Sequence, residues 1–575
     1  MQQLRPRNLV LVMSLLIMLS GVAISFNVQT SFGSVVVTEV DFVDASDANI
    51  HSTLQRPVYA TSAHPLPGVV VIHGSFQNKE WVMSFGIELS RRGFVVLTID
   101  ANGHGNSDPG RGAGTAAVEY LADLDYVDES EIGLIGHSMG GGYSWNAINE
   151  STVTIDALVL VGSWIGNTSL YPYIPNTLIA VGDFDSISSY PRNTTILEPY
   201  FNVTSVEPGV TYGSFEDGSA RRLATSKTNH LFETIDTVIV SETIEWMKNS
   251  LKNGAEDSYW LPSSNLLYPL WLVGGFLSIL GILLTIFPLI LILLDLSVFK
   301  EIKDEPSNSH YSTSKSFVGY GVIYAVIGIG TFFPFLAVGT ILDIFIPFPQ
   351  SYGLPVMSWI LGSALLSVLT LWIISRFRKN AGLNLHKLAH LRSENGYPLR
   401  DVLRMFAMGL IVIAWMYLWT LAVDVGLSMD LRCFLPGFHD LTLLQVLQVP
   451  LYFIVFFIYF TVEGMWLTGP LQTKPEETLN STMVNRTMKT TSMKTVPYLI
   501  LVFVEFGGGY LAGRAVIPGM IGYSFMFFYA FIPWFAVATV VTMFAYRHTG
   551  NYYLGAILNA MMTGWILASI LSIRA

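Results

Sequence analysis

Nine long runs of mostly apolar residues constrain the fold of this chain more than any other feature of its sequence. Each has about the 20 residues, or nearly so, that a helix needs to cross the roughly 30 Å hydrocarbon core of a bilayer. The runs cover residues 9–26, 267–294, 317–345, 355–374, 402–425, 444–467, 496–512, 520–546 and 552–573. Hydrophobic residues make up 51% of the chain, which is too many for one soluble fold, so the sequence predicts a multi-pass membrane protein.

The apolar runs divide the chain into three parts. Residues 1–26 have two interpretations, a cleaved signal peptide and an uncleaved signal anchor. The anchor is favoured because the apolar stretch is long for a signal peptide and no small-residue cleavage site follows it. We expect residues 27–260 to form one soluble domain. We expect residues 261–575 to form a membrane domain of about eight transmembrane helices, which makes about nine in total.

The positively charged residues predict the orientation in the membrane. Seventeen Lys and Arg residues fall on one set of loops, and the opposite short loops hold only Arg432 and Arg514. The first set comprises the N-terminus, the segments 300–315, 376–404 and 474–494, and Arg547. Cytoplasmic loops carry the excess of Lys and Arg. The N-terminus is therefore predicted to be cytoplasmic, and residues 27–260 to be extracytoplasmic at a cell membrane.

The composition of the soluble part excludes several partners. Residues 27–260 contain 28 Asp and Glu against 11 Lys and Arg, and such an acidic domain argues against a nucleic-acid partner. Cys433 is the only cysteine, so there is no disulfide framework and no cysteine metal site. The predicted partners are the lipid bilayer and a small-molecule or lipid ester. We predict no metal and no organic cofactor, and the sequence leaves the oligomeric state open.

Short β-branched runs in the soluble part alternate with helical patterns. The runs cover residues 69–72, 94–99, 132–135, 157–161 and 178–181, and this alternation predicts a parallel sheet with helices on both faces. Directly after the run 132–135 comes Gly136-His137-Ser138-Met139-Gly140. A strand, a Gly-x-Ser-x-Gly turn and a helix expose the serine hydroxyl at the carboxyl edge of a sheet. Ser138 is therefore the candidate nucleophile.

Four motifs in this order resemble the α/β-hydrolase superfamily. They are Pro67 to Gly74, Arg91 to Asp108, the turn around Ser138, and Gly182-Asp183-Phe184-Asp185. The motif sequences are most similar to those of the dienelactone-hydrolase and serine-aminopeptidase-like branches. The resemblance extends over about residues 34–252. The resemblance implies a doubly wound, mostly parallel α/β sheet and a serine hydrolase that works through an acyl-enzyme. A carboxylic ester is the expected substrate, with peptidase or transacylase activity as variants.

The chain order of this fold, nucleophile, acid and then histidine, assigns the remaining site residues. His230 is the only histidine between Ser138 and Trp260, so it is the expected base. The family's usual spacing selects Asp185 as the acid, with Asp183 as the alternative. The expected oxyanion hole consists of the backbone N–H groups of Met139 and Ser75, with Phe76 as the neighbouring candidate.

The short connection between two of the predicted strands indicates how open the site is to a substrate. Only 16 residues separate Val161 from Leu178, which leaves no room for a helical cap, so we expect a lidless hydrolase. Short linkers tether the domain close to the bilayer. A lipid-derived or membrane-proximal ester is therefore a reasonable substrate, beside short water-soluble esters.

Two segments of the membrane domain resemble the CAAX-type intramembrane proteases. They are residues 461–471 and 546–560, but Gly464, Thr468 and Asn559 stand where that family has catalytic or charged residues. The resemblance therefore implies a domain that has lost proteolysis. Intramembrane carboxylates are costly and often functional, which makes Glu505 and Glu463 candidates for a polar site. They also support an alternative function, a transport or scaffold protein whose hydrolase-fold ectodomain binds or senses a ligand.

Overall fold

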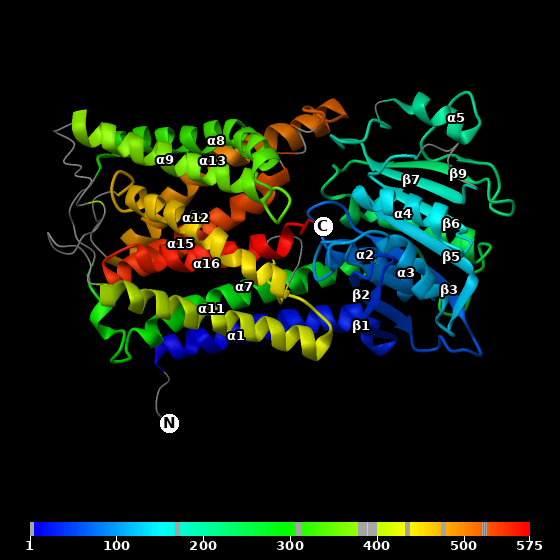
Figure 1. Ribbon diagram of the computed structural model, residues 1–575, viewed down its shortest axis with the longest axis horizontal. Helices are drawn as coiled ribbons and strands as arrows, with labels where there is room; N and C mark the ends of the chain where they lie inside the picture. Colours follow the sequence, from blue (N-terminus) through cyan, green and yellow to red (C-terminus); the bar gives the residue numbers. More distant parts are fainter. Residues whose placement is uncertain are drawn as a thin grey trace.

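The computed structural model describes residues 5–166, 173–191, 193–305, 312–377, 388, 399–431, 437–472, 479–519, 521, 524 and 526–574. Figure 1 shows two parts side by side along the long axis, a bundle of long helices and a twisted sheet with helices on both faces. The N-terminus lies at the far end of the bundle, and the C-terminus lies where the two parts meet.

The sheet has nine strands among the described residues, in the order β1-β2-β4-β3-β5-β6-β7-β9-β8. Six neighbouring strands run parallel and form its centre: β3 (Leu66–Ile72), β4 (Val95–Ile99), β5 (Val127–His137), β6 (Ala157–Val161), β7 (Asn176–Gly182) and β9 (Arg221–Ser226). Antiparallel strands complete both edges: β1 (Val35–Val43) and β2 (Asn49–Pro57) on one, β8 (Thr211–Tyr212) on the other. This is the α/β-hydrolase-type sheet that the sequence predicted.

Side chains that alternate along the central strands fill two separate cores. Val69 and Val71 pack with α2 (Met83–Ser90) and α6 (Thr237–Leu251) on one face. Val70 and Ile72 face the opposite core. There they pack with α3 (Ala113–Ala122) and α4 (Met139–Glu150). Because neighbouring residues of a strand point to opposite faces, continuous apolar strands require helices on both sides.

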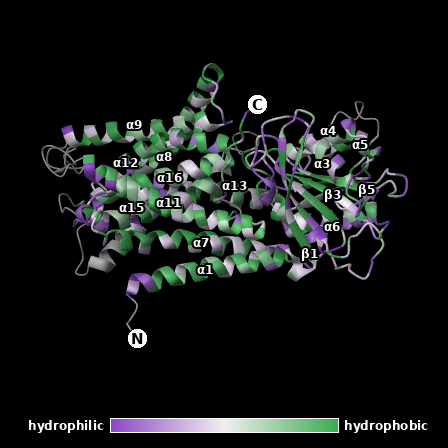
Figure 2. Ribbon diagram, turned by 60° about the horizontal axis from the view of Figure 1, so that its bottom comes forward, coloured by the Kyte–Doolittle hydropathy of each residue, from purple (hydrophilic) through white to green (hydrophobic). Residues whose placement is uncertain are grey.

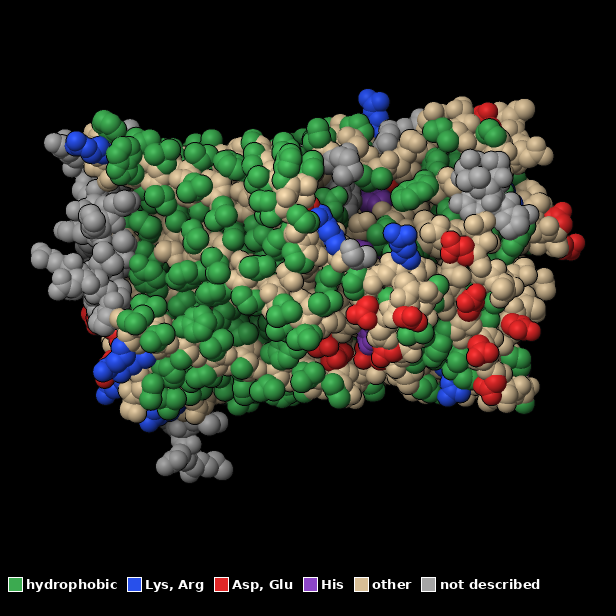
Figure 3. All heavy atoms as spheres, viewed as in Figure 1, with side chains coloured by type: hydrophobic (Ala, Val, Ile, Leu, Met, Phe, Trp, Pro, Cys, Tyr) green, Lys and Arg blue, Asp and Glu red, His purple; other side chains and the backbone are tan. Residues whose placement is uncertain are grey.

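The bundle contains the other long helices. They are α1 (Pro6–Gln29), α7 (Tyr268–Leu293), α8 (Ser314–Phe345), α9 (Gly353–Phe377), α11 (Leu399–Leu427), α12 (Leu443–Leu467), α13 (Leu479–Ala512), α15 (Met526–Thr549) and α16 (Tyr553–Ile570). In the described part of the chain, nine helices have the length and composition to cross a membrane. Apolar residues dominate the bundle (Figure 2). Figure 3 shows acidic side chains over the sheet part and Lys and Arg side chains at the far end of the bundle.

The bundle is built around α16, whose span is 89% buried by its neighbours. Helix α1 packs along α7 through small residues. A Cβ on Gly21 would overlap the main chain of α7 at Gly274 and Ser278, and the Ser25 hydroxyl donates to the Trp271 carbonyl at 3.1 Å. Small residues let two helix backbones approach closely in a membrane. The first apolar run is thus an integral helix of the bundle.

One predicted boundary is wrong. The seventh run was expected to begin at residue 496, after a basic loop from Lys474 to Lys494. Instead, α13 begins at Leu479 and its apolar span covers Thr487–Ala512, so Lys494 lies inside the helix. Its ammonium group is buried and paired with the Glu463 carboxylate of α12. This pairing offsets part of the cost of a charge inside the membrane.

Candidate active site

The turn after β5 has the tight geometry that a serine nucleophile requires. Ser138 has φ 51° and ψ −115°, a left-handed backbone conformation that costs energy outside glycine. A Cβ on Gly136 would lie 2.5 Å from the Gly141 nitrogen, and one on Gly140 would overlap the Ile72 carbonyl oxygen. Both glycines are therefore required for α4 to begin directly behind the serine.

The structure brings Ser138, His230 and Asp185 into one hydrogen-bonded chain. His230 Nε2 lies 2.9 Å from Ser138 Oγ, and His230 Nδ1 lies 3.0 Å from Asp185 Oδ2. An ionised Asp185 only accepts hydrogen bonds, so Nδ1 carries the ring proton and Nε2 is left to accept from the serine. Ser138 is half-buried, while His230 and Asp185 are buried.

The backbone around Asp185 stabilises its ionised form. Asp185 Oδ1 accepts hydrogen bonds from the backbone nitrogens of Ile187 at 2.6 Å and Ser188 at 3.0 Å. Burial alone would raise the pKa of Asp185, but His230 and these two N–H groups lower that pKa below its ordinary value. A carboxylate held in this way can orient the histidine and balance the positive charge that forms on it.

The alternative acid, Asp183, lies outside this chain of bonds. Its carboxylate interacts with Thr225 and Lys227, and burial raises its pKa. Its backbone nitrogen donates to the Ser226 carbonyl at 2.7 Å, which fixes the turn between β7 and β9. Of the two carboxylates in this turn, Asp185 is the one that reaches His230.

The predicted oxyanion loop packs directly against the nucleophile. The Cβ position of Gly74 is 3.0 Å from Ser138 Cβ and 2.8 Å from His137 Nδ1. Gln77 Oε1 accepts from the Gly74 nitrogen at 2.8 Å and lies 2.9 Å from His137 Nδ1. Ser75 and Phe76 therefore follow a glycine that contacts the serine, and Met139 begins α4 on its other side.

Two buried groups, Glu233 and His137, lie next to His230, and Glu233 is the one that the sequence reasoning missed. Glu233 is fully buried, its Oε1 accepts from the Gly182 nitrogen at 2.7 Å, and its Oε2 lies 3.4 Å from His230 Nδ1. His137 Nε2 lies 3.5 Å from the same Oε2. The only signal for Glu233 is its position three residues after His230, which a 3-10 turn (Glu233–Ile235) brings back against the strands.

Burial decides the charge states of these two groups. Burial, followed by the charge of Asp185, raises the pKa of Glu233 well above its ordinary value. Burial and the neighbouring His230 lower the pKa of His137 well below its ordinary value. Burial therefore favours the neutral form of both groups.

Two sets of side chains in the described part of the chain bring metal-ligating atoms within 4.8 Å of one another. One is His137, His230 and Glu233, in which His230 Nδ1 already bonds Asp185. The other is Asp424, Asp430 and Asp440, near the junction of the two parts. The first set is better explained by hydrogen bonding than by metal coordination.

The membrane domain covers the loops that carry the site. Phe184, between the two aspartates, contacts the Tyr510 ring with centroids 6.1 Å apart, and the Gly519 nitrogen donates to the Ser186 carbonyl at 2.6 Å. Phe76 of the oxyanion loop contacts the Tyr352 ring at 4.4 Å. The acid loop and the oxyanion loop therefore both rest on membrane-domain residues.

The histidine loop and the loop after β4 make equivalent contacts. Phe232 packs against Phe506 of α13 and Tyr529 of α15, with ring centroids 5.5 Å apart in both pairs. Gln445 donates to the Gly105 carbonyl at 2.6 Å. The carboxyl edge of the sheet thus faces the bundle, as Figure 1 shows. Among the described residues between β7 and β9, the helices are short, η4 (Thr194–Leu197) and α5 (Glu198–Phe201), and the helical bundle covers the edge of the sheet where a cap would be.

The two intramembrane glutamates lie in different places. Glu505 precedes Phe506 on α13, so it lies near the junction of the two parts, and its Oε2 is buried with no hydrogen-bond partner among the described residues. Glu463 is buried and paired with Lys494. Gly464 lies against the Tyr552 ring, and Asn559 donates to the Ala538 carbonyl at 2.9 Å. These two departures from the protease motif serve helix packing.

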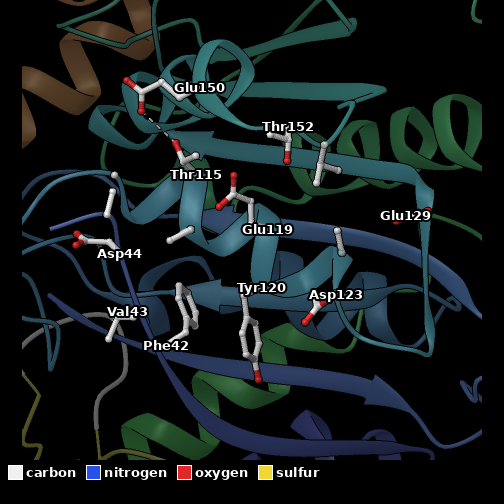
Figure 4. A pocket seen from close by; sticks show the side chains of 15 residues that line it. Phe42, Val43, Asp44, Thr115, Glu119, Tyr120, Asp123, Glu129, Glu150 and Thr152 are labelled. Carbon is white, nitrogen blue, oxygen red and sulfur yellow. Dashed lines mark hydrogen bonds between the residues drawn. The ribbon is translucent and has the colours of Figure 1, made fainter. Parts of the chain in front are cut away.

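A separate groove of about 920 Å³ lies on the hydrolase part. Figure 4 shows side chains of α3 and of the segments after β1 and α4 around it. Its lining includes Asp44, Glu119, Asp123, Glu129 and Glu150. No residue of the Ser138 chain lines it.

Comparison with known proteins shows that the sheet-containing part of the chain is similar in sequence to serine hydrolases. Residues 63–185 match the family model described as serine aminopeptidase, S33. Over 194 residues the chain is 27% identical to a bis(hydroxyethyl) terephthalate hydrolase of Streptomyces coelicolor, which covers 33% of this chain and 58% of the relative. Residues 63–185 therefore have the sequence signature of a serine hydrolase family.

Two cutinases give a similar result. The chain is 25% identical over 183 residues to Cutinase 2 of Thermobifida cellulosilytica, covering 31% of this chain and 65% of the relative. It has the same identity over the same length to the cutinase of Thermobifida fusca, of which 53% is covered. The chain thus spans between 53% and 65% of the length of these three relatives. These three relatives are named as a terephthalate hydrolase and two cutinases, and the match covers no more than 33% of this chain.

Proposed function

We propose that this protein is a membrane-embedded serine hydrolase that cleaves carboxylic esters at the extracytoplasmic face of a cell membrane. The observation that carries the proposal is the chain of hydrogen bonds from Ser138 through His230 to Asp185, on a strained turn that only this nucleophile geometry explains. The names of the relatives, a terephthalate ester hydrolase and cutinases, support an ester over an amide.

The geometry leads to a two-step reaction. Ser138 Oγ attacks the ester carbonyl while His230 Nε2 takes its proton. The backbone N–H groups of Met139 and Ser75 stabilise the oxyanion. His230 then gives the proton to the leaving alcohol, and the acyl-enzyme remains. A water molecule, deprotonated by the same nitrogen, releases the acid. Asp185 keeps the ring oriented throughout and balances the imidazolium charge.

The contacts with the bundle support a membrane-derived substrate. Three loops that carry site residues pack on α13, on α15 and on the segment directly before α9, through Phe184, Phe232 and Phe76. An ester reaching Ser138 passes this aromatic junction, where an acyl chain is better solvated than in water. We therefore propose an amphiphilic, lipid-derived ester. The basic residues at the far end of the bundle support the cytoplasmic placement of that end.

The test is covalent labelling with a fluorophosphonate in detergent and in lipid nanodiscs. The wild type is expected to be labelled and Ser138→Ala is not. Ser75→Ala is the matched control and stays labelled, because the proposed role of Ser75 uses its backbone and not its hydroxyl. Equal labelling of wild type and Ser138→Ala refutes the assignment. Esters of one alcohol with short and long acyl chains then test the substrate class, and a preference for the shortest chain contradicts a lipid-derived substrate.

A further inference from the structure

A second carboxyl group, Glu233, lies behind the proposed triad in a space closed to water. It is fully buried in the 3-10 turn after the histidine loop. Its Oε1 accepts from the Gly182 nitrogen at 2.7 Å. Its Oε2 lies 3.4 Å from His230 Nδ1 and interacts with the Asp185 side chain, which bonds the same histidine nitrogen. Gly162 has no side chain at this point, and a Cβ there would overlap Oε2.

The hydrogen bonds available to Glu233 determine which form it takes. Among the described residues, no donor reaches Oε2. An ionised Glu233 would leave a bare negative oxygen beside the ionised Asp185, with both groups removed from water. Two carboxyl groups that share a buried site do not both ionise, and one retains a proton. Asp185 already receives two backbone N–H groups and the ring proton of His230, so the proton stays on Glu233.

We propose that Glu233 is a positioning residue that remains protonated and donates its hydrogen bond to Asp185, which keeps Asp185 ionised against His230. This inference rests on the proposed serine hydrolase function. The neutral acid adds a donor to the triad acid without adding a second negative charge near His230. An ionised residue at this place would hold His230 in its protonated form, in which Nε2 cannot accept the serine proton.

Several charged or titratable groups face Glu233 from the elements packed against it. They are Asp185 after β7, His230 in its own loop, His137 at the end of β5, and Asp236 at the start of α6. The short helix η2 (Lys79–Val82), which carries Lys79 and Glu80, also packs against the 3-10 turn, and Lys79 is paired there with Glu39 and Glu80. His137 is neutral because of its burial. The ionised carboxylate nearest to His230 is therefore Asp185.

The test compares two substitutions in the full-length protein. Glu233→Gln keeps a donor toward Asp185 and an acceptor for the Gly182 nitrogen, while Glu233→Leu keeps neither. We expect Glu233→Gln to retain the wild-type kcat and the acidic limb of the wild-type pH profile. We expect Glu233→Leu to lose roughly 10- to 100-fold in kcat. If Glu233 were ionised, Gln would move the acidic limb down by about one pH unit or more. That shift, or an equal loss in two folded variants, overturns the proposal.

Infrared spectroscopy gives a readout that does not need turnover. At about pH 8, where an exposed glutamate is ionised, the difference spectrum between the wild type and Glu233→Gln should contain the carbonyl stretch of one protonated carboxylic acid. A difference spectrum without this band refutes a protonated Glu233. A wild type without turnover or fluorophosphonate labelling refutes the hydrolase function instead, so the two failures are distinguishable.

Discussion

The substitution Asp185→Asn tests the site most sharply because the backbone dictates how the new amide must lie. Asp185 Oδ1 accepts from the Ile187 and Ser188 nitrogens at 2.6 and 3.0 Å. In the variant, the amide oxygen must keep these two bonds, so the NH₂ group turns toward His230 Nδ1. Two donors cannot face each other, and the ring therefore takes the tautomer with its proton on Nε2.

The consequence is a loss of catalysis without a loss of fold. A proton on Nε2, 2.9 Å from Ser138 Oγ, prevents that nitrogen from accepting the serine proton. Inverting the tautomer in a serine triad costs about 10⁴-fold in kcat. By transition-state arithmetic this is roughly 5 kcal/mol, far more than the ~1 kcal/mol of a single neutral hydrogen bond. The variant should unfold near the wild-type temperature.

The assay is the initial rate of ester hydrolysis, with Asp183→Asn as the matched control. Asp183 bonds Thr225 and Lys227, away from the histidine, so its variant should stay within about tenfold of the wild type. The reasoning is refuted if Asp185→Asn keeps more than about a tenth of wild-type kcat. It is also refuted if Asp183→Asn shows the larger loss.

Three further predictions concern stability and coupling. The pKa of Glu233 is raised in the folded state, so its contribution to stability is complete below the unfolded value and is lost as pH rises toward the folded value. Glu233→Gln should therefore gain free energy of unfolding relative to the wild type as pH rises, by up to about 1.4 kcal/mol per pH unit, and a difference in melting temperature that is constant with pH contradicts this. Gly21→Val should destabilise the α1–α7 packing by about 1–3 kcal/mol in a thermal melt, while Gly319→Val, with open space around it, should not. Phe232→Ala and Phe506→Ala should show a coupling of about 0.5–1.5 kcal/mol in kcat/KM, and strictly additive effects would disprove contact across the junction.

The fold could be predicted largely because its signals are local. The strands and the turn at Ser138 combine continuous apolar runs with glycines at fixed positions, and both depend on neighbours in the sequence. The apolar runs likewise predict long helices from length and composition alone. The exact start of α13 could not be predicted in this way. Its polar first half is helical because Lys494 meets Glu463 on another helix, and that partner lies 31 residues away.

The site residues that could be predicted are those that a motif, their order or their spacing along the chain identifies. Ser138 and His230 were accessible because one stands in a turn motif and the other is the only histidine between Ser138 and Trp260. Asp185 came from the family's spacing. Glu233 was missed because its importance depends on the fold, which places it against Asp185 and removes it from water. A glutamate three residues after a histidine is an ordinary surface residue in most sequences.

The helical bundle covers a site that would be open if the hydrolase part, which has no inserted cap between β6 and β7, stood alone. A short connection between β6 and β7 predicts an open site when the hydrolase part is considered alone. In the whole chain, aromatic residues of α13 and α15 contact the histidine and acid loops, and Tyr352 contacts the oxyanion loop. These loops hold the groups whose positions set the rate, and a displacement of about 1 Å can cost about 10²-fold. The bundle therefore acts on catalysis through the loops it supports, and a hydrolase domain separated from it should fold yet turn over esters slowly.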